Sequence, residues 1–423
     1  MKVVEADWTW TGERFEEGVR LAVGDDGRFA AVGRLEHEPH ERYRARALVP
    51  GFVNAHSHAF QRGLRGHGES FPAGAGSFWS WRESMYRLVE ALGPRELETL
   101  TRRAFREMLA AGITSVGEFH YVHHGKDGAD WGLDRAVLAA ARAEGIRVVL
   151  LNVYYRTGAI GEPLAGAQRR FDGRSLEAYW QNHEALAREL EPARESLGVA
   201  PHSIRAVPLA ELAPLVREAR ARGLPVHMHV EETHKEIADC RAALGKGPLE
   251  LLLEQGLVDA GFTAVHGTHS SRADLARLAE RGANLCLCPT TEANLGDGLP
   301  ELVEPPRHEL ALGTDSNARI SMLEELRWGE YGQRLRGEKR GGLLDASGAW
   351  APRWLRAATL GGARSLGLAA GAFEPGRFAD WVALDLEAPE LAGWTPKTLA
   401  ESLACGASER VLAGTWVGGK RVV

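Results

Sequence analysis

One pattern recurs through the middle of the chain: a helical stretch ends at a glycine, and an apolar, β-branched segment follows within a few residues. It occurs at Gly112, Gly145, Gly223, Gly256 and Gly282, for example in "GIRVVLLNVYY". A glycine just past a helix end adopts the left-handed conformation without the penalty of a Cβ atom. Strands that alternate with helices in this way are typical of parallel β-α-β units.

Eight candidate strands follow this pattern. They lie near residues 50–58, 113–121, 146–155, 196–202, 225–231, 262–268, 283–289 and 309–315. Eight consecutive β-α units predict an α/β fold of the (β/α)₈ barrel type. We expect the barrel to span residues 49–370. An open, doubly wound parallel sheet is the alternative.

The two ends of the chain differ from this middle part. Residues 1–48 contain "GVRLAVGDDGRFAAVG", and residues 371–423 contain "VLAGTWVGGKRVV". Both read as short strands joined by tight turns. We therefore expect the two ends to combine into one small β-sandwich domain beside the barrel.

Composition indicates the kind of partner and the cellular compartment of the protein. Both charge signs are interspersed and the net charge is −6, which favours a small-molecule partner over nucleic acid or a membrane surface. No run of 18 apolar residues and no signal-peptide pattern are visible in the sequence. The four cysteines show no disulfide-framework spacing. We expect a cytoplasmic protein and a homodimer.

Polar residues gather at the carboxyl ends of the predicted strands, which is the face where barrel active sites lie. The first strand ends in His56 and His58. Because side chains alternate along a strand, both imidazoles point to the same side. Neutral imidazole is a good zinc ligand, and catalytic zinc sites combine about three protein ligands with a water. The pair therefore indicates a metal site.

The fifth strand carries the segment "HMHVEE". His227 and His229 share one face of the strand, and Glu232 follows where the strand becomes a loop. A ligand histidine with a carboxylate just beyond it combines metal binding with proton transfer. We assign His229 to the metal and Glu232 to acid–base chemistry, with Glu231 as the alternative. His227 lies deeper in the barrel and is expected to be packed.

The sixth and eighth strands end in His266 and Asp315. A buried carboxylate needs a partner, and a metal and its water would supply one for Asp315. The alternative is that Asp315 caps the following helix. His266 is interpreted as a polar neighbour of the site or as an electrostatic partner for the attacking hydroxide.

These strand-end residues together resemble the amidohydrolase superfamily in its mononuclear deaminase branch. Dinuclear members generally add a bridging carboxylated lysine or a glutamate on the third or fourth strand. No lysine occurs in "SLGVAPHSIRAV". The resemblance implies one Zn²⁺ ion per chain, held by His56, His58, His229 and Asp315.

Further motifs are similar to those of the formimidoylglutamate deiminase family: "HSHAFQRGLRG", "FWSWRESMY", "EFHYVHH", "PHSIRAV" and "CPTTEANLGDG". The resemblance implies catalytic roles for Glu232, His266 and Asp315. It implies substrate contacts for Gln61, Arg82, Tyr121, His202 and Arg205. One departure is "TDSN", in which Asn317 stands where the family more often has histidine.

The activity that this resemblance implies is hydrolysis of N-formimino-L-glutamate to N-formyl-L-glutamate and ammonia in histidine degradation. Such a substrate carries two carboxylates, and planar guanidinium groups bind carboxylates well. Three alternatives remain: a deaminase of a nucleobase or nucleoside, a catalytically silent binding protein, and a hydrolase that releases formamide from the same substrate.

Overall fold

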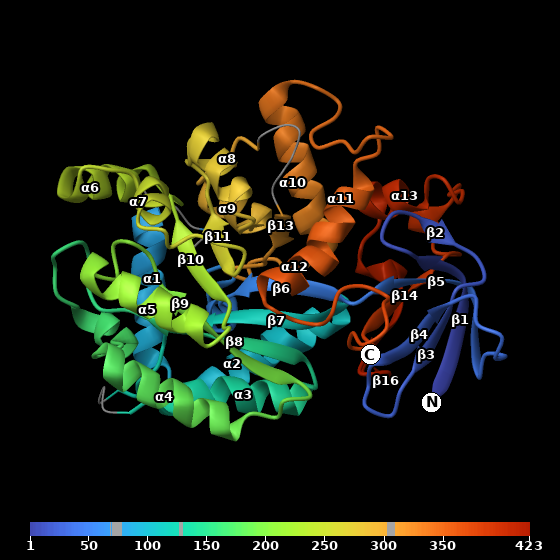
Figure 1. Cartoon of the computed structure of the whole chain (residues 1–423), viewed down its shortest axis with the longest axis horizontal. Helices are drawn as coiled ribbons and strands as arrows, with labels where there is room; N and C mark the ends of the chain where they lie inside the picture. Colours follow the sequence, from blue (N-terminus) through green and yellow to red (C-terminus); the bar gives the residue numbers. More distant parts are fainter. Residues whose placement is uncertain (68, 70–77, 127–129, 303–308) are drawn as a thin grey trace.

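The computed structural model describes residues 1–67, 69, 78–126, 130–302 and 309–423. It consists of a large barrel domain and a smaller β-domain that contains both chain termini (Figure 1). The predicted fold class is confirmed. The domain divisions at residues 48/49 and 370/371 stay a prediction.

The barrel contains eight parallel strands in sequential order. They are β6 (Phe52–Ser57), β7 (Ile113–His120), β8 (Arg147–Tyr154), β9 (Glu195–Pro201), β10 (Val226–Val230), β11 (Phe262–His266), β12 (Asn284–Leu287) and β13 (Glu309–Leu312). All eight match the predicted segments, and only β9 begins outside its segment, by one residue. The segment after β13 returns to β6, because Asp315 N donates to His56 O at 3.0 Å and His58 N donates to Asp315 O at 2.8 Å. The sheet therefore closes at its carboxyl end, which excludes the open sheet.

Helices cover the outside of the barrel (Figure 1). They are α1 (Phe78–Ala91), α2 (Pro94–Ala110), α3 (Gly132–Glu144), α4 (Leu176–Glu189), α5 (Leu209–Ala221), α6 (His234–Leu244), α7 (Pro248–Glu254), α8 (Arg272–Glu280), α9 (Pro289–Leu295), α10 (Met322–Gly337), α11 (Ala351–Arg356) and α12 (Gly362–Ser365). Short helical turns add η1 (Ala59–Leu64), η2 (Gly166–Phe171) and η3 (Ala357–Gly361).

The five glycines of the repeated pattern all adopt a left-handed backbone, with φ between 66° and 82°. Gly112, which separates α2 from β7, shows a second constraint. A Cβ atom there would lie 3.1 Å from the Phe52 ring and 3.0 Å from Val382. Glycine is thus required for both the turn and the close approach of the two domains.

The small domain is one hydrogen-bonded sheet built from both ends of the chain. Its strands are β1 (Lys2–Trp10), β2 (Phe15–Glu16), β3 (Arg20–Val23), β4 (Phe29–Gly33), β5 (Glu41–Pro50), β14 (Trp381–Asp385), β15 (Leu412–Val417) and β16 (Lys420–Arg421). The order is β16-β15-β14-β5-β1-β3-β4, with β2 paired to β1. Register shifts in the β1–β5, β14–β15 and β3–β4 pairs increase the local twist. The apolar core of this domain includes Trp381 and Trp416, whose rings stack, and both residues belong to this single sheet.

A buried ion pair fixes the two domains to each other. Arg147 on β8 donates from Nε and Nη2 to the two carboxylate oxygens of Asp380, each at 3.1 Å. Both side chains are almost fully buried, and the Arg147 guanidinium also lies over the Phe378 ring. Bidentate pairs of this kind add geometric specificity to charge attraction.

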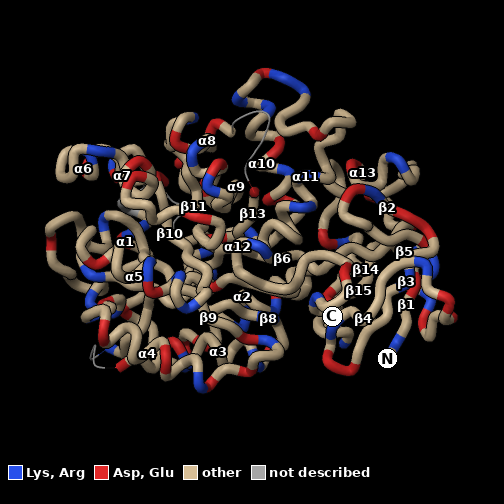
Figure 2. The backbone as a smooth tube through the Cα atoms, in the orientation of Figure 1, with Lys and Arg blue, Asp and Glu red and all other residues tan. Residues whose placement is uncertain are grey.

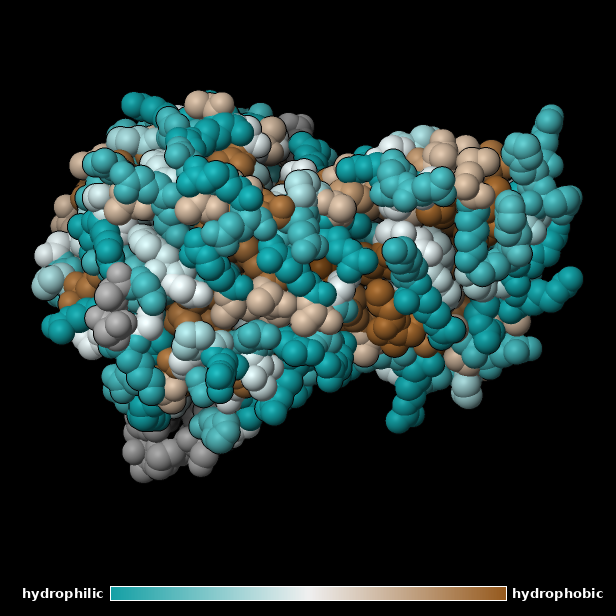
Figure 3. Space-filling model, turned by 90° about the horizontal axis from the view of Figure 1, so that it is seen from below, coloured by the Kyte–Doolittle hydropathy of each residue, from teal (hydrophilic) through white to brown (hydrophobic). Residues whose placement is uncertain are grey.

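Lys and Arg residues are interspersed with Asp and Glu residues along the backbone of both domains (Figure 2). Seen from below, the surface shows apolar side chains at the waist where the two domains meet (Figure 3). Within the described residues, no helix combines the length and apolar character needed to cross a bilayer.

The remaining short helical segments are η4 (Pro389–Leu391), α13 (Leu399–Gly406) and η5 (Glu409–Val411).

Candidate active site

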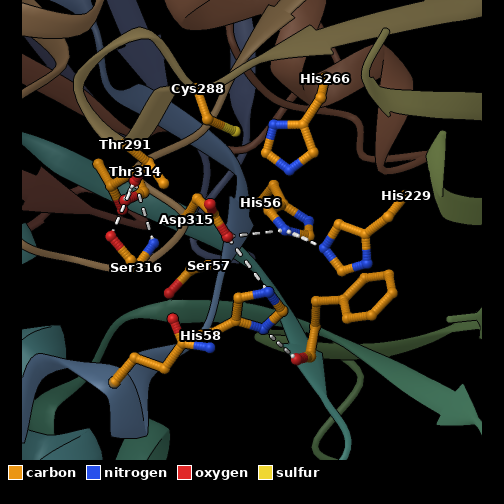
Figure 4. Close-up of polar contacts among 12 residues, drawn as sticks. His56, Ser57, His58, His229, His266, Cys288, Thr291, Thr314, Asp315 and Ser316 are labelled. Atoms are coloured by element: carbon orange, nitrogen blue, oxygen red, sulfur yellow. Dashed lines mark hydrogen bonds and ion pairs between the residues drawn. The ribbon is translucent and has the colours of Figure 1, made fainter. Parts of the chain in front are cut away.

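Four predicted metal ligands converge at the carboxyl end of the barrel (Figure 4). His56 and His58 come from the end of β6, His229 from β10 and Asp315 from the loop after β13. Asp315 Oδ1 lies 3.2 Å from His56 Nε2 and 3.2 Å from His58 Nε2. His229 Nε2 lies 3.1 Å from His56 Nε2. Zinc bonds of about 2.0–2.2 Å in a tetrahedron separate the ligand atoms by about 3.3 Å, so the spacing suits one such ion.

The hydrogen bonds of two histidines leave their inner nitrogens available to a cation. His58 Nδ1 lies 2.8 Å from Phe119 O, and His229 Nδ1 lies 3.0 Å from His202 O. A carbonyl oxygen only accepts, so each Nδ1 carries the proton. Each Nε2 then directs a lone pair toward the centre. Outer hydrogen bonds to carbonyls are the usual way in which metal-bound histidines are oriented.

The surroundings also keep these imidazoles neutral, as metal binding requires. Burial lowers the pKa of His56 to about 3. Burial, together with the neighbouring histidines, lowers the pKa of His229 well below its ordinary value. The residues present therefore fit a divalent cation in charge, spacing and tautomer.

The backbone is strained at the same strand ends. Among the described non-glycine residues, seven have positive φ, and Glu231, His266, Asp315 and Asn317 are four of them, with φ between 43° and 72°. Such conformations cost about 1–3 kcal/mol each and concentrate at functional sites. Asn317 tolerates this region and joins β6 by donating to Ser57 Oγ at 3.1 Å. The departure at "TDSN" therefore leaves the position of Asp315 intact.

The structure separates the two candidate glutamates. Glu232 lines the pocket beside the ligand set, and its Oε1 lies 3.8 Å from His266 Nε2. Glu231 turns away and accepts from Leu249 N on α7 at 3.1 Å. This placement favours Glu232 for chemistry in the pocket.

The structure also shows where Asp315, His227 and His269 lie. Asp315 does not cap α10, because Ser321 occupies that position and accepts from Glu324 N. His227 is packed as predicted, with Nε2 2.8 Å from Ser365 O. His269 lies in the loop after β11 and stacks on His234.

Sequence reasoning missed the partner of His266. Glu292, at the start of α9, is fully buried, and its Oε1 lies 3.3 Å from His266 Nδ1. Burial opposes a charged imidazole, but the nearby carboxylates raise the pKa of His266 well above its ordinary value. Glu292 belongs to the motif "CPTTEANLGDG", which the sequence analysis identified without assigning a function to this glutamate. Only the fold brings it to the end of β11.

One pocket contains all five side chains that the family resemblance implies for substrate contact. Its space, including solvent at the mouth, is about 510 Å³. Three of the four proposed metal ligands, His58, His229 and Asp315, line it, and Trp81, Met85, Tyr86 and Phe171 add apolar walls. The five implied contacts are Gln61, Arg82, Tyr121, His202 and Arg205. The arrangement thus joins a metal site to two guanidinium groups in one cavity.

The hydrogen bonds of Gln61 define what it offers a ligand. Gln61 Nε2 donates to the Tyr121 hydroxyl at 2.8 Å. Gln61 Oε1 is buried and has no hydrogen-bond partner among the described residues. Buried acceptors are nearly always paired, so this oxygen is suited to an N–H group of a bound molecule.

Comparisons with known proteins agree with this geometry. The family model of the amidohydrolase family matches residues 47–422. A curated protein of Pseudomonas aeruginosa named formimidoylglutamate deiminase is 39% identical over 100% of this chain and 95% of its own length. The crystal structure of an amidohydrolase from Brucella melitensis superposes with a TM-score of 0.91 at 34% identity, covering 100% of this chain and 94% of that one. A zinc-bound adenosine deaminase from Xanthomonas campestris gives a TM-score of 0.81 at 27% identity, covering 99% and 92%.

Proposed function

Because this chain belongs to the amidohydrolase family, we propose that it is a metal-dependent deiminase that hydrolyses N-formimino-L-glutamate to N-formyl-L-glutamate and ammonia in histidine degradation. The observation that carries this proposal is a single pocket in which a metal-ligand set faces two arginines. The name of the Pseudomonas aeruginosa relative supports the same substrate.

We propose one Zn²⁺ ion per chain, held by His56, His58, His229 and Asp315. When bound, such an ion would polarise a water molecule and lower its pKa toward about 7. The zinc in the Xanthomonas campestris neighbour supports this choice of metal.

The chain's own residues would then move the protons of the reaction. Asp315 accepts a proton from the attacking water as its oxygen bonds to the formimino carbon. His266 stabilises the charge that develops beside that oxygen, and Glu292 orients its ring. Glu232 carries the second proton of the attacking oxygen to the imino nitrogen, and the proton taken by Asp315 is transferred there as well. The C–N bond to that nitrogen then breaks as the C=O bond forms, and ammonia leaves. The formyl group stays on the glutamate nitrogen.

Substrate recognition follows from charge and hydrogen bonding in the pocket. Arg82 and Arg205 would hold the two carboxylates, because guanidinium forks match carboxylate geometry. The unpaired oxygen of Gln61 would accept from an N–H of the formimino group. Tyr121 and His202 complete the walls around the substrate.

A nucleoside deaminase is the second candidate, supported by the adenosine deaminase neighbour and by the pocket's aromatic walls. The half-buried guanidinium groups of Arg82 and Arg205 suit a substrate with two negative charges better than a neutral base. The deciding experiment compares kcat/KM for N-formimino-L-glutamate and for adenosine with the zinc-loaded enzyme. Preference for the formimino compound supports the proposal, and preference for adenosine overturns it.

Arg205 gives a direct test of carboxylate binding. Its guanidinium lines the pocket and makes no hydrogen bond to the described residues. Leaving one charge of a desolvated pair without its partner costs about 2–5 kcal/mol. We therefore expect Arg205→Met to lower kcat/KM for N-formimino-L-glutamate by about 30-fold or more. Steady-state kinetics on formimino compounds with two, one and no carboxylates measure the effect.

The loss should vanish on compounds that lack the affected carboxylate. An equal loss on all of these compounds, or a wild type that prefers the neutral one, would show that Arg205 does not read a carboxylate. Arg222→Met is the matched control, because this arginine just after α5 pairs with Glu218 and lies outside the pocket.

We further propose a cytoplasmic homodimer whose partner is the small-molecule substrate rather than nucleic acid or a membrane. Four free thiols support a reducing compartment. Trp328 and Leu335 on α10, two turns apart and 46% and 75% exposed, support a contact between chains. Light scattering should give about twice the mass of one chain, and Leu335→Glu should lower it. A wild-type mass equal to one chain contradicts the dimer.

A further inference from the structure

A tyrosine that no part of the proposed chemistry uses lies at the wall of the pocket. Tyr155 directly follows β8, is 2% exposed and lines the same cavity as Arg205. Its neighbour Tyr154 points the other way, and the Tyr154 hydroxyl donates to Glu211 Oε2 at 2.6 Å. The alternation of side chains at the end of the strand thus sends one tyrosine to the outer helices and the other into the pocket.

The ring of Tyr155 is held on two sides. Its centroid lies 4.7 Å from that of His202 and 5.5 Å from that of Phe171, both in edge-to-face geometry. Such contacts fix an aromatic ring without using its hydroxyl. Among the described residues, none forms a hydrogen bond with the Tyr155 hydroxyl, although buried tyrosines usually find a partner.

The backbone places Tyr155 close to Arg205. Arg156 N donates to Ala206 O at 2.7 Å, and Thr157 Oγ1 donates to Arg205 O at 3.0 Å. The segment after β8 is therefore joined to the segment after β9. Burial lowers the pKa of Arg205, and of the neighbours that raise it Tyr155 has the largest effect. This agrees with a close approach of the two side chains.

We propose that Tyr155 is a substrate-binding residue whose hydroxyl donates to the same carboxylate that Arg205 binds. A neutral O–H donor beside a guanidinium gives a carboxylate a second, directional hydrogen bond. It also makes the subsite selective for a group that accepts two bonds at once, as a carboxylate does. This inference deepens the proposed function and rests on it for the identity of the substrate.

The test uses the full zinc-loaded enzyme and Tyr155→Phe, which keeps the ring and removes only the hydroxyl. A lost hydrogen bond to a charged group should raise KM for N-formimino-L-glutamate by about tenfold or more, with kcat changed less than KM. Tyr154→Phe is the matched control and should leave both constants as in the wild type. Thermal unfolding of the three proteins verifies that each is folded.

Two comparisons identify the carboxylate. N-formimino-4-aminobutanoate lacks the α-carboxylate, and N-formimino-L-2-aminobutanoate lacks the γ-carboxylate. The proposal predicts that Tyr155→Phe has no effect on one of them. It also predicts that the substitution adds little in the Arg205→Met background, because the two side chains share one ligand group.

Binding of N-formyl-L-glutamate, measured by calorimetry, gives a readout that needs no turnover. If the wild type binds this compound but releases no ammonia from the formimino substrate, the proposed function fails, while a weaker Tyr155→Phe complex still supports the role of Tyr155. An unchanged dissociation constant and KM in Tyr155→Phe, or an equal loss on all compounds, overturns it.

Discussion

Replacing Glu232 with glutamine is expected to lower turnover by about 10²–10⁴-fold while the metal stays bound. General acid–base groups typically contribute a factor of this size. Glutamine keeps the shape of the side chain but cannot pass a proton from the attacking water to the imino nitrogen. Glu232 is also outside the ligand set, since the convergent group is formed by the three histidines and Asp315. Steady-state kinetics together with elemental analysis of the variant measure both quantities.

Glu231 offers a matched control in the adjacent position. Its carboxylate accepts from Leu249 N and lies outside the pocket. We expect Glu231→Gln to keep nearly normal turnover, with any cost appearing in stability. Near-normal turnover of Glu232→Gln would instead assign the proton transfer to another residue.

Loss of the metal should abolish turnover. Complete chelation is expected to leave an inactive but folded protein, and about one equivalent of zinc should restore activity. Removing a ligand should act in the same way, so His229→Ala should lose both the ion and the activity. Elemental analysis before and after chelation, paired with ammonia release, checks this prediction.

His227 provides the comparison on the same strand and the same face. It is bound to Ser365 O below the site and belongs to none of the candidate metal groups among the described residues. His227→Gln should therefore retain the ion. Two tightly held ions per active chain, or full activity after thorough chelation, would contradict the single-metal proposal.

The barrel could be predicted from the sequence because its signals are local. Five of the helix-to-strand connections carry a glycine that adopts positive φ, and the strands that follow are largely apolar because both faces are covered. The metal ligands could be predicted for a related reason. A histidine or aspartate at the carboxyl end of any barrel strand reaches the same mouth, so His56 and Asp315 converge despite their separation in sequence.

The remaining features depend on tertiary contacts that no local pattern encodes. The sequence assigns Glu232 to acid–base chemistry but leaves Glu231 open, and only the fold shows that Glu231 has a positive φ and accepts from Leu249 N on α7. Glu292 reaches His266 because α9 begins just after the end of β12, the strand next to β11. The Arg147–Asp380 pair joins residues from two domains. A role for the Tyr155 hydroxyl could be inferred only after the fold placed Tyr155 in the same pocket as Arg205.

The most direct test of the whole account is product analysis in ¹⁸O-labelled water. The zinc-loaded enzyme is incubated with N-formimino-L-glutamate, and ammonia is quantified while the organic product is examined by mass spectrometry. Hydrolysis at the formimino carbon with loss of the imino nitrogen predicts equal amounts of ammonia and N-formyl-L-glutamate, with the label in the formyl oxygen. Release of formamide and glutamate, or no turnover by the fully loaded enzyme, would contradict it.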